Sequence, residues 1–76
     1  MYNTSKLRGR IVEKYLTLSE FAKAINKELR FVSTYLNNQR QLSQKDILDW
    51  AAALDIPNNE IPLYFFTLEV HETEQS

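Results

Sequence analysis

Few side chains in this sequence have the chemistry that catalysis or metal binding requires. There is no cysteine among the 76 residues, and the one histidine, His71, lies near the end of the chain. Acidic residues occur in pairs, Asp46 with Asp49 and Glu69 with Glu72, but no partnered base, glycine-rich loop or metal-ligand cluster accompanies them. We therefore expect a protein that is not an enzyme and that uses no cofactor, metal or small-molecule ligand.

A different chemistry, hydrogen bonding to bases and phosphates, fits the basic residues between Lys6 and Lys45. All nine Lys and Arg residues lie in this part of the chain together with only three acids, so its charge is about +6. From Asp46 onward there are seven acids and no Lys or Arg, a charge of about −7. This asymmetry indicates either contact with nucleic acid or two solvated faces of opposite sign.

Two short helices joined by a tight bend are expected to position the basic residues. Thr17 can accept an amide hydrogen bond at the start of a helix, and Glu20 can return one, which is a capping-box pattern. Apolar residues recur at helical spacing to about Ile25, and Asn26 readily adopts the left-handed conformation that ends a helix. A second periodic run follows over about residues 28–37. The pattern predicts a helix-turn-helix.

Further helices on both sides of this pair would complete a small core. Apolar residues at every fourth position from Leu7 to Tyr15 predict a first helix, capped by Thr4 or the residue after it. Another helix is expected to begin after Ser43, with Trp50 half-buried on it. The sequence thus predicts an all-α bundle of four to five short helices.

The segment from residue 61 to residue 70 is unusually apolar. Pro62 permits a helix to begin there but not to run through it. The later residues alternate apolar with polar, which is the period of a half-buried strand, so helix and strand both remain open. One interpretation is that this segment covers the core. The other is a homodimer contact, because an apolar edge strand needs a cover, formed by Phe65, Phe66, Leu68 and Val70.

The second helix of the predicted pair is the one that would read bases. A recognition helix enters the major groove by its N-terminal part, while the preceding helix crosses the backbone. The residues expected to contact bases are Glu28, Leu29, Arg30, Phe31 and Thr34. The residues expected to contact phosphates are Thr17, Leu18, Lys27, Ser33, Asn37, Asn38 and Arg40.

These motifs also resemble a known family. Leu16-Thr-x-x-Glu-Phe-Ala-x-x-Ile, followed by Val32-Ser-x-Tyr-Leu-Asn-Asn, is similar to the lambda-repressor-like helix-turn-helix of phage Cro and CI repressors and bacterial Xre-type regulators. Three blocks, residues 2–14, 36–38 and 56–66, resemble small Cro-like phage proteins more closely. The resemblance implies a lambda-repressor-like bundle with a short extended aromatic C-terminal segment. It also implies a regulator encoded by a phage or prophage, with double-stranded operator DNA as its partner and a homodimer as a possible state.

The bend departs from the pattern of that family. Lys27 stands where an apolar residue usually packs under the bend, and Glu28 stands where Ser or Thr usually caps the helix. Leu29 is therefore expected either to take the apolar role or to face DNA. Together with the apolar Phe31, these residues motivate an alternative hypothesis: an anti-repressor or accessory module that keeps the fold and binds a protein in place of DNA.

Length and hydropathy limit the remaining possibilities. Seventy-six residues predict one helix-turn-helix DNA-binding domain over residues 1–70 and a polar tail over 71–76. No apolar run is long enough to span a membrane, and no signal-peptide pattern opens the chain. We therefore expect a cytoplasmic protein.

Overall fold

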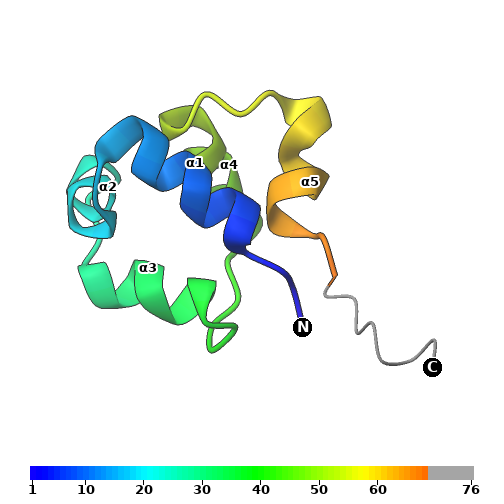
Figure 1. Cartoon of the computed structure of the whole chain (residues 1–76), viewed down its shortest axis with the longest axis horizontal. Coiled ribbons are helices and arrows are strands. Elements are labelled where there is room, and N and C mark those ends of the chain that lie inside the picture. Colours follow the sequence, from blue (N-terminus) through cyan, green and yellow to red (C-terminus); the bar gives the residue numbers. More distant parts are fainter. Residues whose placement is uncertain (69–76) are drawn as a thin grey trace.

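Short helices account for most of the chain. The computed structural model describes residues 1–68. The elements in order are α1 (Ser5–Tyr15), α2 (Leu18–Ala24), α3 (Leu29–Leu36), α4 (Gln44–Ala53), the 3-10 helix η1 (Asn58–Glu60) and α5 (Ile61–Phe65). Figure 1 shows α1 lying across α4, with α2 and α3 on one side and α5 on the other. Because the described residues form helices and no strand, the predicted all-α class is confirmed.

The described residues bear on the predicted domain boundary and on the expectation that nothing spans a membrane. The predicted domain boundary at residue 70 and the polar tail 71–76 lie outside the described residues. Within the described residues, no helix combines the length and hydropathy that crossing a bilayer requires.

Helix α1 forms as its four-residue apolar period predicts, but it begins differently. Leu7 and Ile11 are completely buried on its inner face. Thr4 is the N-cap residue, yet its side chain makes no capping bond. Its hydroxyl instead donates to the carbonyl oxygen of Leu36 in α3, at 2.8 Å. The predicted cap by Thr4 is therefore wrong, because a buried hydrogen bond between two helices takes its place.

Helix α2 begins with half of the predicted capping box. The Thr17 hydroxyl accepts from the amide of Glu20 at 3.1 Å, which confirms the cap. The return bond is not formed, because the Thr17 amide donates to the carbonyl of Tyr15 at 2.8 Å. The Glu20 carboxylate lies 3.5 Å from the ammonium of Lys23 on the next turn.

Helix α4 carries the centre of the core. The Ser43 hydroxyl accepts from the amide of Asp46 at 3.1 Å, which confirms the predicted start. Trp50 is only 1% exposed, so the prediction that it is half-buried is wrong. Aromatic rings surround it, and edge contacts of this kind add to the area that it buries. Measured between ring centroids, the distances from Trp50 are 5.1 Å to Phe21, 5.4 Å to Tyr35, 6.3 Å to Phe31 and 6.3 Å to Phe65.

The C-terminal segment is helical at first and extended only at its end. Pro62 lies in the first turn of α5, where its missing amide hydrogen costs nothing. The expected strand over residues 66–70 is reduced, in the described part, to one antiparallel β-bridge between Leu68 and Tyr2. Val70 lies outside the described residues. The chain's own N-terminus therefore pairs with Leu68.

Candidate nucleic-acid interface

The turn between α2 and α3 determines how α3 is presented. Asn26 adopts a φ of 62°, in the left-handed region that asparagine tolerates well. The Asn26 amide donates to the Lys23 carbonyl at 3.0 Å and the Lys27 amide to the Ala22 carbonyl at 2.9 Å, so the last turn of α2 is satisfied. Glu28 follows as the N-cap of α3, without a side-chain capping bond. The turn leaves both Lys27 and Glu28 exposed.

Helix α3 has a buried face and an accessible face. Val32, Tyr35 and Leu36 are buried, so these three side chains form the inner face of α3. The Tyr35 hydroxyl donates to the carbonyl of Phe65 at 3.3 Å, and burial raises the pKa of Tyr35 to about 12. On the accessible side, Arg30 is exposed. The predicted base-contact residues thus divide into exposed ones, Glu28, Leu29 and Arg30, and half-buried ones, Phe31 and Thr34.

The position of Leu29 shows whether its side chain packs under the bend or stays at the surface. Its side chain is 46% exposed at the first position of α3, so it does not pack under the bend. The expectation that Leu29 replaces the missing apolar residue is therefore wrong. Ile25, at the end of α2, is partly buried against the core. The first turn of α3 consequently stays at the surface.

The Phe31 ring connects the core with the charged surface. On one side its edge contacts Trp50, with ring centroids 6.3 Å apart. The Lys27 ammonium lies 5.0 Å from the centroid of the same ring, and the Arg40 guanidinium carbon lies 4.5 Å from it. Both distances are within the range of cation–π attraction. The structure therefore brings together three of the predicted site residues.

Thr34 also contacts Arg40, because its hydroxyl both donates a hydrogen bond and accepts one. It donates to the carbonyl of Arg30 at 2.8 Å or to that of Phe31 at 3.1 Å. It also accepts from Nε of Arg40 at 3.0 Å. A hydroxyl has one hydrogen to donate, so little of the Thr34 side chain remains free for a base edge.

The residues predicted to contact phosphates do not form one cluster, and several of their side chains already have partners within the chain. Thr17 is exposed at the start of α2, but its hydroxyl already accepts the capping bond. Leu18 packs against the core, which leaves only its backbone amide for such a contact. The Ser33 hydroxyl donates to the carbonyl of Arg30 at 3.3 Å, and Asn37 is exposed at the end of α3.

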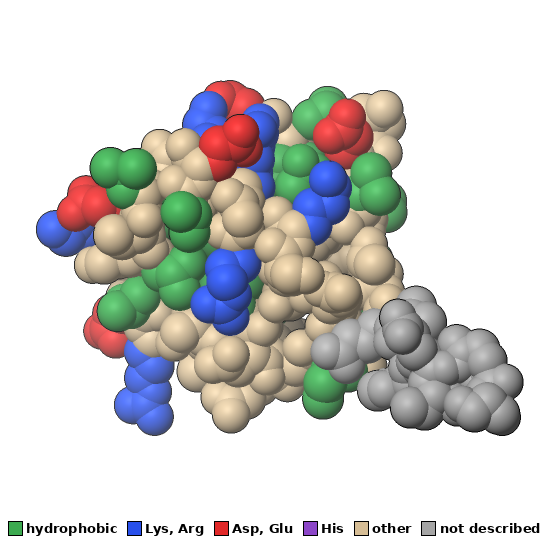
Figure 2. All heavy atoms as spheres, in the orientation of Figure 1, with side chains coloured by type: hydrophobic (Ala, Val, Ile, Leu, Met, Phe, Trp, Pro, Cys, Tyr) green, Lys and Arg blue, Asp and Glu red, His purple; other side chains and the backbone are tan. Residues whose placement is uncertain are grey.

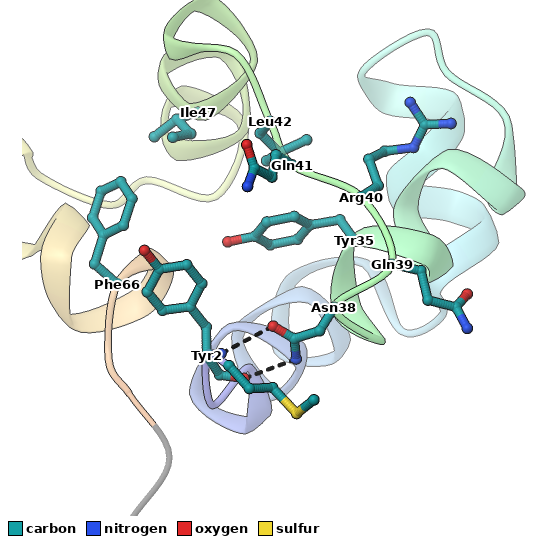
Figure 3. Close-up of a pocket in the computed structure, with 10 residues that line it drawn as sticks. Tyr2, Tyr35, Asn38, Gln39, Arg40, Gln41, Leu42, Ile47 and Phe66 are labelled. Carbon is teal, nitrogen blue, oxygen red and sulfur yellow. Dashed lines mark hydrogen bonds between the residues drawn. The ribbon is translucent and has the colours of Figure 1, made fainter.

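Asn38 holds the N-terminus of the chain against the end of α3. Its Oδ1 accepts from the Tyr2 amide at 2.9 Å, and its Nδ2 donates to the Tyr2 carbonyl at 2.9 Å. Figure 3 shows this pair of bonds, while the side chains of Gln39 and Arg40 point away from Tyr2 and Phe66. Both polar atoms of the Asn38 side chain are therefore occupied within the chain, where the sequence had predicted a phosphate contact.

The predicted dimer contacts separate into a core residue and surface residues. Phe65 is 1% exposed and packs against Tyr35, so it is not on the surface of this structure. Phe66 and Leu68 are 46% and 62% exposed. The ring of Phe66 meets that of Tyr2 edge-on, with centroids 5.8 Å apart. The two rings border a groove of about 730 Å³ that also extends along residues 38–42.

Within residues 1–68, ion pairing leaves two sets of cations without acidic partners: Lys6 with Arg8 on α1, and a second set around α3. Within residues 1–68 the ion pairs are Arg10 with Glu13, Lys14 with Asp55, Lys23 with Glu20, and Lys45 with Asp49. Lys27, Arg30 and Arg40 form none with the described residues. Figure 2 shows a face on which basic and acidic side chains are otherwise interspersed.

Two residues that organise this region were absent from the predicted site. Tyr2 binds Asn38, 36 residues away, and Thr4 binds Leu36, 32 residues away. No local spacing could have indicated these partners, because each bond depends on how α1 and α3 pack. Only the hydrogen-bonding capacity of Thr4 beside a helix start was visible in the sequence.

Comparison with known proteins agrees with this architecture. The structure is similar to the solution structure of the modulator of repression (MOR) of the temperate bacteriophage TP901-1 from Lactococcus lactis. The sequence identity is 37%, the TM-score is 0.77, and the match covers 92% of this chain and 95% of that chain. The likeness defines the class as small phage regulatory proteins of all-α fold, which confirms the phage-regulator level of the sequence-based resemblance.

The family itself follows from the sequence match. A family model described as "Protein of unknown function (DUF739)" matches residues 1–68, and the chain belongs to this family. No curated protein matches the chain. The narrower assignment to Cro-type helix-turn-helix proteins stays a prediction.

Proposed function

We propose that this protein regulates phage transcription by binding operator DNA, with α3 in the major groove. The observation that carries the proposal is the group of cations around the first turn of α3. Lys27, Arg30 and Arg40 have no acidic partner among the described residues, and all three line one groove beside α3. Lys6 and Arg8 are also without an acidic partner there, but they lie on α1. Neutralising phosphates with such cations is the main source of affinity for DNA. The similarity to a modulator of repression supports a role in the same kind of regulation.

Within this proposal the cations around α3 divide between two tasks. Arg30 would donate two hydrogen bonds to a guanine edge, the commonest specific contact in the major groove. Lys27 and Arg40 would contact phosphates, which positions the protein without reading sequence. Glu28 would face DNA only by accepting from a cytosine amino group, since phosphates repel its carboxylate.

A mobility-shift titration with the DNA upstream of the protein's own gene tests this proposal. Arg30→Ala is expected to weaken binding by about 1–3 kcal/mol and to relax one base preference. Lys6→Ala is the matched control. It also removes one positive charge, but Lys6 lies elsewhere, over the Tyr64 ring of α5. Salt-independent binding, or equal losses for both variants, would refute a role of α3 in DNA recognition.

A homodimer would fit a palindromic operator, because a twofold axis places two recognition helices one DNA turn apart. The exposed side chains of Phe66 and Leu68 are the candidates for this contact among the described residues. Analytical ultracentrifugation of the protein and of Leu68→Asp tests it. A wild-type protein that stays monomeric, both free and on DNA, would exclude the dimer.

A protein partner is the second candidate, and the exposed Leu29 beside Glu28 favours it. Phosphates repel a carboxylate, and an exposed leucine gains more from burial against a protein than from facing phosphates. Glu28→Gln separates the two candidates. If α3 binds DNA, losing the charge should strengthen binding or leave it unchanged. If α3 binds a protein through Glu28, the variant should bind DNA no better and lose the partner.

A further inference from the structure

Arg40 lies outside α3, in the connection to α4, yet its side chain returns to the helix. Its Nε donates to the Thr34 hydroxyl at 3.0 Å, and its guanidinium carbon lies 4.5 Å from the centroid of Phe31. Two independent contacts thus hold one guanidinium, a hydrogen bond from Nε and a cation–π contact with the Phe31 ring. An arginine in a connecting segment would otherwise sample many rotamers, and ordering it costs entropy.

The two residues that hold Arg40 are themselves held. The Thr34 hydroxyl bonds back to the carbonyl of Arg30 within α3. The Phe31 ring is fixed from below by Trp50, which is 1% exposed. The position of the guanidinium is therefore determined by the core and by the helix, although Arg40 itself is exposed.

The held guanidinium still has free donors. A guanidinium carries five N–H donors, and the only hydrogen bond of Arg40 with the described residues uses Nε. The Lys27 ammonium lies 5.0 Å from the same ring centroid. Both cations line the same groove, so an anion in that groove would be attracted by each of them.

The space beside these cations is open and mainly basic. A groove of about 460 Å³ is lined by Asn26, Lys27, Glu28, Arg30, Phe31 and Arg40. Glu28 is the acid among these lining residues, and it forms no ion pair with the described residues. The Glu28 carboxylate would repel an anion, whereas three cations of the lining, Lys27, Arg30 and Arg40, would attract one, so the balance of charge favours a small anionic group.

We propose that Phe31 and Thr34 are positioning residues that hold the Arg40 guanidinium, beside Lys27, as a binding site for a DNA backbone phosphate. This inference rests on the proposed DNA binding, and it deepens it. Phe31 and Thr34 then leave the set of base-reading residues. Base reading falls to Arg30, with Glu28 and Leu29 beside it. Phe31 acts through Arg40, and not by contacting a thymine methyl.

A double-mutant cycle tests the inference with a short mixed-sequence duplex, because a phosphate contact does not depend on sequence. The variants are Phe31→Leu, which keeps an apolar side chain against Trp50, Arg40→Ala, and both together. Phe31→Leu is expected to weaken binding about two- to fivefold, the equivalent of an exposed cation–π contact. Arg40→Ala is expected to lower the slope of log K against log salt by about 0.9. In the Arg40→Ala background, Phe31→Leu should have no further effect.

A second measurement tests the positioning without DNA. In the free protein, the Nε–Hε resonance of Arg40 should carry a ring-current shift that Phe31→Leu removes. The Nε–Hε resonance of Arg30 serves as the control and should not move. Thr34→Val should also change the Arg40 resonance and the DNA affinity, whereas Thr34→Ser, which keeps the hydroxyl, should restore both. Circular dichroism of each variant excludes unfolding as the cause.

The outcomes separate this inference from the function on which it rests. Additive effects of Phe31→Leu and Arg40→Ala, with wild-type binding intact, would overturn the positioning role and leave DNA binding standing. An unchanged Arg40 resonance in Phe31→Leu would overturn it in the same way. Absence of any salt-dependent binding by the wild-type protein would overturn the proposed function and the phosphate site with it.

Discussion

Replacing Thr4 by Val tests whether one buried hydrogen bond joins the first and third helices. The change keeps the shape of the side chain and removes the hydroxyl that donates to the Leu36 carbonyl at 2.8 Å. Thr4 is 9% exposed and Leu36 is 3% exposed, so water has little access to the carbonyl once its partner is gone. Leaving a buried acceptor without a partner costs about 1–3 kcal/mol.

That cost is large for a domain of this size. A chain of 76 residues has a free energy of unfolding of roughly 4–11 kcal/mol at 0.05–0.15 kcal/mol per residue. Each kcal/mol lowers the melting temperature of a small domain by about 4–8 °C. A loss of about 2 kcal/mol should therefore lower the melting temperature by roughly 8–16 °C, measured by thermal unfolding followed by circular dichroism.

Thr4→Ser is the matched control, because serine keeps the donor and loses only a methyl group. It should cost clearly less than Thr4→Val. If Thr4→Ser destabilises the protein as much as Thr4→Val, the hydrogen bond contributes no more than one buried methyl group. If Thr4→Val melts with the wild type, the reasoning that this bond stabilises the fold is refuted.

Three further predictions concern an ion pair, a pair of hydrogen bonds and the core. The hydrogen bond and the charge of Lys14 lower the pKa of Asp55, so the stability from this pair is present above the ordinary aspartate pKa of about 4 and is lost as pH falls through the lowered value. Asp55→Asn, which suits the φ of 55° at this position, should remove that part of the acid sensitivity in melting curves measured against pH. Asn38→Gly keeps the φ of 62° and removes both bonds to Tyr2, so amide exchange should accelerate at Tyr2 and not in α2. Trp50→Ala should lower the free energy of unfolding by about 3–5 kcal/mol and remove much of the helical circular dichroism signal at room temperature. A stable, helical variant would contradict the central place of Trp50 in the core.

The local features of the helices were predictable because their causes lie within a few residues. The hydroxyls of Thr17 and Ser43 cap their helices through amides three positions later, and the sequence contains both partners of each bond. Asn26 ends α2 through its own backbone preference. The buried stripes, such as Leu7 with Ile11, follow from the helical period alone.

The candidate site was predictable only in part, for the opposite reason. The sequence identified α3 and its basic surroundings, because charge and helical period are visible along the chain. It could not show that Thr34 uses its hydroxyl for Arg40, since six residues and the end of a helix separate them. It also could not show that the Phe31 ring contacts Trp50 in the core and lies within cation–π distance of Lys27 and Arg40.

By itself, then, the sequence determined an all-α chain, the ends of its helices and the concentration of positive charge around the third of them. Only the tertiary structure decided which polar side chains remain free. Asn38 hydrogen-bonds to Tyr2, and Thr4 to Leu36, because packing brought residues more than 30 positions apart within hydrogen-bonding distance. A donor that finds such a partner inside the fold is no longer available outside it. Lys27, Arg30 and Arg40 form no ion pair with the described residues, so their charges remain without an acidic partner there.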